Sequence, residues 1–230
     1  MELKRITSGG HYGDLTLQGT GELETDGVVI DAPGQAVLIN RLQVSNVRYP
    51  LIVRRVGQFV VNDYVPHTFW GDTLNIRASH VHIGRLAPQN IIQKLPYDTL
   101  HQDIIFQAYA VAEDGYTLNP NGVIEDICIR DINVSSPLTP VNGIMLSEVN
   151  RYSHFYLGQD RLHVGINAPY WLSGNTLEYA VVGGRDNLIF NPADHGQQPT
   201  VRLQNVKHSV FHSHDDNFWD LPGMEQAVLA

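Results

Sequence analysis

A short pattern recurs eight times along this chain of 230 residues: an apolar residue, two polar or variable residues and a second apolar residue, set among alternating β-branched residues. Three of the intervals between successive copies are 23, 23 and 24 residues, and the other four are 14, 30, 17 and 33. A repeat of this length, with insertions, is typical of a solenoid, in which successive coils stack around one continuous core. Only the third copy departs from the pattern, because Ser79 stands where an apolar residue is expected. The copies begin at Ile39, Val53, Ile76, Phe106, Ile129, Leu146, Tyr179 and Leu203.

The clearest copy predicts strands rather than helices. Residues 73–77 alternate polar and apolar, a short corner follows, and residues 81–83 alternate again, so that alternate side chains share an inward face. No apolar period of 3.6 residues extends over three turns. We therefore predict an all-β, single-domain parallel β-helix, a solenoid of about eight to ten rungs stacked roughly 4.8 Å apart. In such a coil we expect Ile76, Ile129 and Leu203 to line up in one interior column.

Three segments are expected within this single domain. Residues 1–36 form an N-terminal lead-in segment with the first strands, and residues 37–212 form the β-helix rungs. Residues 213–230 are too polar for another rung, so we expect a C-terminal cap or a tail that contacts a partner. Binding and catalytic groups concentrate on loops that a rigid scaffold holds, and the candidate loops between rungs are residues 84–102, 110–122, 158–176 and 190–199.

The charge and composition exclude several classes of function. The net charge of −9 argues against a nucleic-acid partner, and the densest basic cluster is only the pair Arg54–Arg55. No apolar run is long enough to predict a membrane span, and the N-terminus lacks the apolar stretch of a secretory signal, so we expect synthesis in a cytoplasm. The single cysteine, Cys128, lies between two isoleucines in a strand-like run, which predicts a buried, unreactive thiol.

Two segments carry a resemblance to a known family. The residues GDTLNIR at 71–77, with VHI at 81–83, and the residues HQDIIFQ at 101–107 are similar to two rungs of the pectate-lyase-like right-handed parallel β-helix superfamily, which includes phage tail spikes and polysaccharide-modifying proteins. The chain keeps Gly71 and Asp72 but has Thr73 where the family has a second glycine. Ile104 stands where glycine is common, and Gln107 falls one residue late. The resemblance implies a right-handed coil.

The candidate catalytic residues are Asp72, His101 and Asp103. A carboxylate can orient a histidine, and a histidine can move a proton of a sugar at neutral pH. His101 and Asp103 lie two residues apart and share a face of a strand, and a neighbouring rung can bring Asp72 alongside. Residues 97–103 also resemble, in residue types but not in spacing, the Tyr, Asp and His cluster of the mannuronan epimerases. The alternative is a polar ladder that satisfies the backbone groups of the corners.

No metal or cofactor is expected. His80 and His82 share a face, as do His212 and His214, but zinc needs a third and usually a fourth ligand, and no segment has the spacing of a known zinc motif. The adjacent carboxylates Asp215 and Asp216 match the paired acids of inverting glycosidases only if they lie in a bent loop.

The three tryptophans each follow another aromatic residue and lie between rungs rather than within them. Such side chains can stack on sugar rings, bury themselves at a subunit interface, or fold back and seal the rod. The predicted carbohydrate or interface residues are Trp70, Trp171 and Trp219.

Together these features favour a virion-associated structural or attachment protein of a phage, such as a head decoration or a tail component. The resemblance to phage spikes implies a homotrimer that contacts other virion proteins and, at the host surface, a glycan; the expected location is the virion. The alternative is a polysaccharide-active enzyme: a lyase, an epimerase or a hydrolase. We favour the non-enzymatic interpretation.

Overall fold

The computed structural model describes the backbone of residues 1–92, 94, 103–119, 122–134, 141–146, 151–162, 166–173, 176–177, 180–182, 201–204, 210–212 and 228–229, and the side chains of residues 1–92, 94, 107–119 and 122–129. Within these residues the regular structure is strand throughout, and none of them forms a helix able to span a membrane. The strands are β1 Glu2–Ile6, β2 Gly10–His11, β3 Asp14–Gln18, β4 Asp26–Val47, β5 Leu51–Phe69, β6 Asn75–Ile76, β7 Val81–Leu86, β8 Gln89–Ile91, β9 Asp103–Ala108, β10 Val123–Val134, β11 Val141–Leu146, β12 Arg151–Leu162, β13 Ile166–Ser173, β14 Thr176–Leu177, β15 Ala180–Val182, β16 Val201–Gln204, β17 Val210–His212 and β18 Val228–Leu229.

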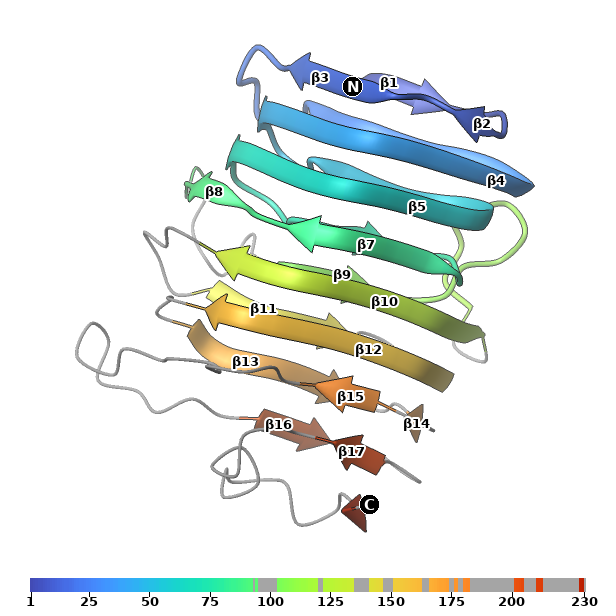
Figure 1. The fold of residues 1–230 in the computed structure, drawn as a ribbon, viewed down its shortest axis with the longest axis vertical. Helices are drawn as coiled ribbons and strands as arrows, with labels where there is room; N and C mark the ends of the chain where they lie inside the picture. Colours follow the sequence, from blue (N-terminus) through green and yellow to red (C-terminus); the bar gives the residue numbers. More distant parts are fainter. Residues whose placement is uncertain are drawn as a thin grey trace.

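The strands wind into a parallel β-solenoid, which confirms the predicted fold class. In Figure 1 the strands in front, such as β7, β10 and β12, run from right to left, and the strands behind, such as β9, β11 and β13, run from left to right while the chain descends. This winding is right-handed. Residues 1–92 make about four turns, and parallel pairing continues through the later strands.

One face of the solenoid, here called the first face, contains β1, the first parts of β4 and β5, then β6, β9, β11, β13 and β16. Its strands stack in register, and a single column of paired positions runs from β1 to β16. The first three steps of this column, from Ile6 to Ile76, are 24, 23 and 23 residues long. The column consists of Ile6, Ile30, Val53, Ile76, Ala108, Leu146, Leu172 and Leu203.

The opposite face, here called the second face, contains β2, β3, the second parts of β4 and β5, then β7, β10, β12, β15 and β17. Ile129 belongs to this face, where it pairs with Ile83 and Leu157. The expectation that Ile76, Ile129 and Leu203 share one column is therefore wrong, because only Ile76 and Leu203 do. The copies that begin at described residues fall on both faces of the coil, so the intervals between copies are not all whole coils.

Inward positions of both faces form one hydrophobic core of Ile, Val, Leu and Phe. Such strands suit β-branched residues, which pack well on a pleated surface. On the second face Phe59, Val61, Ile83 and Ile129 are buried. Cys128 points the other way and is partly exposed, so the predicted buried thiol is wrong. The physical reason is the period of two: a residue between two inward isoleucines must face outward.

One corner of the coil repeats a strained backbone conformation in three successive turns. Asn46, Thr68 and Asn90 all adopt positive φ, at 58°, 53° and 49°, directly before Val47, Phe69 and Ile91, which pair with one another from turn to turn. Their side chains bind neighbouring coils, since Asn46 Nδ2 donates to the Gly19 carbonyl at 3.0 Å and Asn90 Nδ2 donates to Thr68 Oγ1 at 2.7 Å. Asparagine tolerates this region because its short amide can bond locally, whereas a β-branched threonine is an outlier there.

The glycine of the family-like motif has a steric reason in this coil. Gly71 N donates to the Arg48 carbonyl of the preceding coil at 2.8 Å. A Cβ at Gly71 would lie 2.6 Å from Tyr49 Cδ1 and 2.8 Å from that carbonyl oxygen, which is too close for any side chain. The corner after β5 is thus pressed against the coil before it.

Candidate functional site

A cavity of the described residues lies where the first face turns into the second. It has a volume of about 550 Å³. Its walls include Arg54 and Arg55 from β5, Arg77 and Ser79 from the corner after β6, and residues 111–113 from the loop after β9. We call it the arginine pocket. Three cationic side chains converge here in a chain whose net charge is −9.

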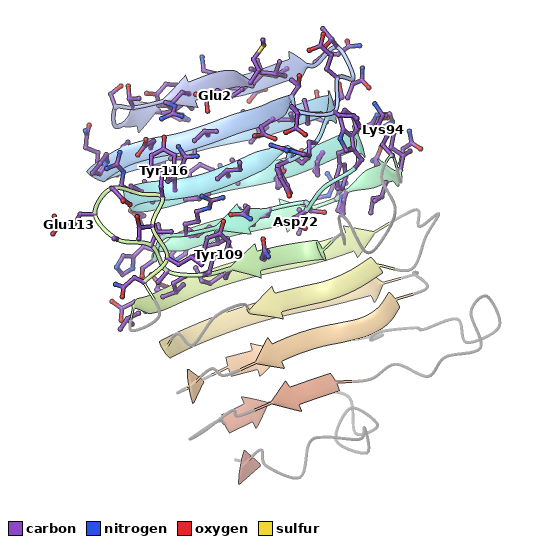
Figure 2. All side chains as sticks on the ribbon, turned by 180° about the vertical axis from the view of Figure 1, so that it is seen from behind. Glu2, Asp72, Lys94, Tyr109, Glu113 and Tyr116 are labelled. Atoms are coloured by element: carbon purple, nitrogen blue, oxygen red, sulfur yellow. The ribbon has the colours of Figure 1, made fainter. Side chains whose placement is uncertain are left out.

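The loop that forms one wall of the pocket, residues 109–119, is held by its own hydrogen bonds. Asp114 accepts hydrogen bonds from the backbone N–H groups of Tyr116 at 2.7 Å and Thr117 at 2.8 Å and from the Thr117 hydroxyl at 2.6 Å. These bonds, that from the Thr117 side chain foremost, lower the pKa of Asp114. Val111 and Leu118 close the loop with an antiparallel bridge. Figure 2 shows this loop, with Glu113 and Tyr116, folded back over the first face toward the N-terminal coils.

Tyr116 packs on the arginines at the rim of the pocket. Arg54 Nη1 donates to its phenol oxygen at 2.8 Å, and the Arg54 guanidinium lies 4.1 Å from the ring centroid. Arg5 Nη1 approaches the same oxygen at 3.5 Å. The hydrogen bond from Arg5 and the positive charge of Arg54 lower the pKa of the exposed Tyr116 phenol.

The carboxylate of Asp31 neutralises part of the positive charge of Arg5 and Arg55. It is 6% exposed and accepts hydrogen bonds from Arg55 Nε at 2.6 Å and from Arg5 Nη1 at 3.1 Å. The bond from Arg55 is the main reason that the pKa of Asp31 is lowered, against the opposing effect of burial. Asp31 is thus the ionised anchor that holds two arginines beside the pocket.

Arg54 and Arg77 are the pocket arginines without a carboxylate. Of the residues that the structure describes, none places a carboxylate oxygen within 4.0 Å of either guanidinium. Arg54 is 8% exposed, and its buried Nε donates no hydrogen bond to any described residue. Arg77 Nε donates to Asn75 Oδ1 at 2.9 Å, and its guanidinium lies 4.8 Å from the Tyr109 ring centroid. The pocket therefore has unneutralised, oriented cations.

The predicted catalytic trio is only partly covered by the described residues. Asp72 is 3% exposed, and its charge, after burial, helps to raise the pKa of Tyr49. Asp103 is the first residue of β9, which pairs with β6 on the adjacent coil of the first face, so Asp72 and Asp103 belong to neighbouring coils. His101 lies outside the described residues, and nothing is described of the Asp103 side chain. The trio stays a prediction.

Trp70 is described in full and is buried rather than available to a ligand. It is 1% exposed, its Nε1 donates to the Leu23 carbonyl at 3.2 Å, and Lys94 Nζ lies 3.5 Å from its ring centroid. Of the interpretations given for this residue, folding back onto the rod is the one that agrees with its position. Trp171 lies in β13 with only its backbone described, and Trp219 lies outside the described residues.

The histidine pair of the second face contacts one carboxylate. His80 Nδ1 lies 2.9 Å from Asp126 Oδ2, and His82 Nε2 lies 2.9 Å from Asp126 Oδ1. Burial opposes ionisation of Asp126, but the two histidine contacts outweigh it and lower its pKa. Among the described residues no group of three metal-ligating side chains is arranged to hold an ion. His212 ends β17, and residues 214–216 lie outside the described residues.

The arginine pocket is not predicted from the sequence, although one signal is available. The pair Arg54–Arg55 is the densest basic cluster, and residues 110–122 are one of four predicted loops, but nothing along the chain shows that the two meet. They meet because β9 and β6 lie side by side, which no spacing along the chain shows.

Comparisons with known proteins returned no match: no family model, no curated protein and no solved structure is similar to this chain.

The ion pairs of Asp31 predict a stability effect that depends on pH. Replacing Asp31 with Asn should lower the free energy of unfolding by about 2 kcal/mol at pH 7, because Arg5 and Arg55 lose their shared carboxylate. Since the pKa of Asp31 is lowered in the folded state, this stabilisation is present above the unfolded pKa of about 3.9 and is lost as the pH falls through the folded value. Urea denaturation of wild type and Asp31→Asn at pH 7, and then at successively lower pH down to about pH 2, measures how the difference between them disappears.

The control for that experiment is Asp63→Asn on the second face. Asp63 also contacts two arginines, Arg41 at 3.2 Å and Arg85 at 2.8 Å, but those arginines are nearly half exposed. We expect a loss of only about 0.5 kcal/mol. Equal losses for the two variants at pH 7 would contradict the buried role of Asp31.

Asp126 offers a substitution that removes charge without disturbing the backbone. Its φ is 58°, a conformation that asparagine tolerates. Asp126→Asn should lower the free energy of unfolding by about 0.5 kcal/mol at pH 7, because it removes the negative charge, and one of the two carboxylate oxygens, that His80 and His82 contact at a partly exposed site. Since the folded pKa of Asp126 is lowered, the difference should shrink below about pH 4. Asp126→Ala should cost more by adding backbone strain, so an alanine variant as stable as the asparagine variant would contradict this account.

Proposed function

We propose that this chain is a structural or attachment component, of the virion type that its motif resembles, and that it works as a rigid rod rather than as an enzyme. The observation that carries the proposal is that its polar side chains bind one another between adjacent coils. On the described faces, charged and amide groups are bound to the next coil, where they hold adjacent turns together.

The best example is a charge ladder on the second face. Asp63 lies between Arg41 of the preceding coil and Arg85 of the following coil, and both arginines contact it. Nearby, Asn40 Nδ2 donates to Asp14 of the coil before it at 2.6 Å. Contacts of this kind fix coil against coil and leave the carboxylates without freedom to take part in chemistry.

A similar ladder runs over the first face and its corner. Arg48 binds Asp26, with Nε donating to Oδ1 at 2.9 Å, and it also contacts Glu24. Asn75 Nδ2 donates to Gln107 Oε1 at 2.8 Å across adjacent coils. These pairs match the polar ladder that the sequence analysis gave as the alternative to a catalytic site.

The direction of the carboxyl pKa shifts supports the same interpretation. Asp31, Asp114 and Asp126 all have a lowered pKa, each through hydrogen bonds to its ionised form. A general acid in a glycosidase or lyase needs a carboxyl pKa raised toward neutrality. None of these three carboxyls therefore has the raised pKa of a general acid.

The rival function is a polysaccharide-active enzyme: a lyase, an epimerase or a hydrolase. The specific observation in its favour is the burial of Asp72, on the coil next to the one that contains β9, the strand that begins at Asp103. Buried titratable groups are candidates for acid–base chemistry.

One experiment separates the two functions. We expect wild-type protein to leave acidic capsular polysaccharide and lipopolysaccharide uncleaved, and we expect His101→Ala and Asp103→Asn to match it in mass and in polymer binding. Light scattering after gel filtration should give the mass of three 25.7-kDa chains. Reducing-end release measures cleavage.

Two results would contradict the proposal. Cleavage by wild type that disappears in both variants, with the oligomer unchanged, would establish the enzyme. A monomer at all concentrations tested would remove the trimer from the proposal.

A further inference from the structure

We propose that the arginine pocket binds an organic oxyanion, a carboxylate, sulfate or phosphate group carried on a small molecule or a saccharide unit. This inference goes beyond the structural role proposed above and does not depend on it. It depends on the convergence of Arg54, Arg55 and Arg77 in a cavity of about 550 Å³.

The size of the pocket fits a ligand larger than an inorganic ion. Ligand pockets in proteins have volumes of about 300–1,000 Å³ and combine an apolar wall with a few oriented polar groups. Here Val56, Ala78 and residues 111–112 supply apolar wall, and the three arginines supply the polar groups.

The balance of charge in the pocket is positive. Asp31 is already bound by Arg5 and Arg55, and Glu113 is the one acidic side chain among the residues that line the cavity. Arg54 and Arg77 remain without a carboxylate among the described residues. A guanidinium presents paired N–H groups that match the oxygens of a carboxylate, sulfate or phosphate.

The arginines are also held in place before any ligand arrives. Arg54 lies against Tyr116 and Arg77 lies against Tyr109, at 4.1 and 4.8 Å from the ring centroids. Each also donates one hydrogen bond, Arg54 to the Tyr116 phenol and Arg77 to Asn75. A fixed guanidinium loses little conformational entropy on binding, which favours affinity.

The need for a partner is greatest at Arg54. This side chain is more than nine-tenths buried, and its Nε has no hydrogen-bond partner among the described residues. Asp31 acts on its charge without a direct contact, and only its Nη1 binds the Tyr116 phenol, so the buried charge is compensated in part, which is costly. An oxyanion in the pocket would bring a counter-charge to this guanidinium. The positive charge of the pocket, its size and the missing carboxylate at Arg54 all fit an oxyanion ligand.

The test uses full-length protein and three probes: sodium glucuronate, sodium sulfate and glucose, each at a constant ionic strength set with sodium chloride. We expect glucuronate to raise the melting temperature in a saturable way and to give a binding isotherm by calorimetry, and glucose to do neither. Arg77→Gln should weaken glucuronate binding by about tenfold or more, since a charge-assisted hydrogen bond contributes at least one factor of ten. Arg54→Gln should weaken it by at least as much.

Matched controls keep the result specific to the pocket. Arg85→Gln removes an arginine of the second face, far from the pocket, and should leave the affinity unchanged. Glu113→Gln removes the acidic lining residue and should tighten binding. If Arg54→Gln does not fold, as judged by circular dichroism, Arg77→Gln carries the test, because Arg77 is partly exposed and its side chain is not part of the core.

Three outcomes would overturn the proposal. The first is the absence of saturable glucuronate binding by wild-type protein. The second is that wild-type protein binds sulfate but not glucuronate, which would make the pocket a site for an inorganic ion. The third is unchanged glucuronate affinity in Arg77→Gln, or an equal loss in Arg85→Gln.

Discussion

Every feature of this molecule depends on the in-register stacking of one coil on the next. A step of 23 or 24 residues returns the chain to the same column, where Ile6, Ile30, Val53 and Ile76 lie one above another inside the coil. Burial of these side chains supplies the main driving force, and the parallel hydrogen bonds satisfy the backbone that burial removes from water. A coil that slipped by one residue would turn its whole inward set to the surface.

The same stacking organises the outside of the rod. Because equivalent positions repeat every coil, polar residues of opposite charge fall beside each other and pair, as at Arg41, Asp63 and Arg85. The arginine pocket is a place where this pairing is incomplete, because Arg54 and Arg77 have no carboxylate partner among the described residues. There the loop of residues 109–119 reaches back over earlier coils and brings Tyr116 onto Arg54, so that segments 62 residues apart form one site. The loop of residues 109–119 thus adds one irregular site, the arginine pocket, to an otherwise regular solenoid.

The sequence predicted the parts of the structure that depend on local periodicity. Alternation of β-branched residues and a repeat near 23 residues were enough for the parallel solenoid. A Cβ at Gly71 would clash with Tyr49, which shows why a side chain does not fit at that corner. The sequence could not assign each repeat to a face, because half a coil and a whole coil look alike along the chain, and Ile129 was placed in the wrong column. Nor could it find the pocket, whose arginines and loop are brought together only by pairing between coils.

The register between coils is tested most directly with the native cysteine. Cys128 pairs with His82 on the outer surface of the second face, and Val60 lies one coil further away in the same column. Adjacent coils are about 4.8 Å apart, within the reach of a disulfide, whereas two coils span about 9.6 Å, which is beyond it. Under mild oxidation the His82→Cys variant should therefore form a disulfide between residues 82 and 128 within one chain and lose both free thiols. The Val60→Cys variant should keep both of its free thiols. Oxidation of Val60→Cys, or two persistent thiols in His82→Cys, would contradict the stacked coil described above.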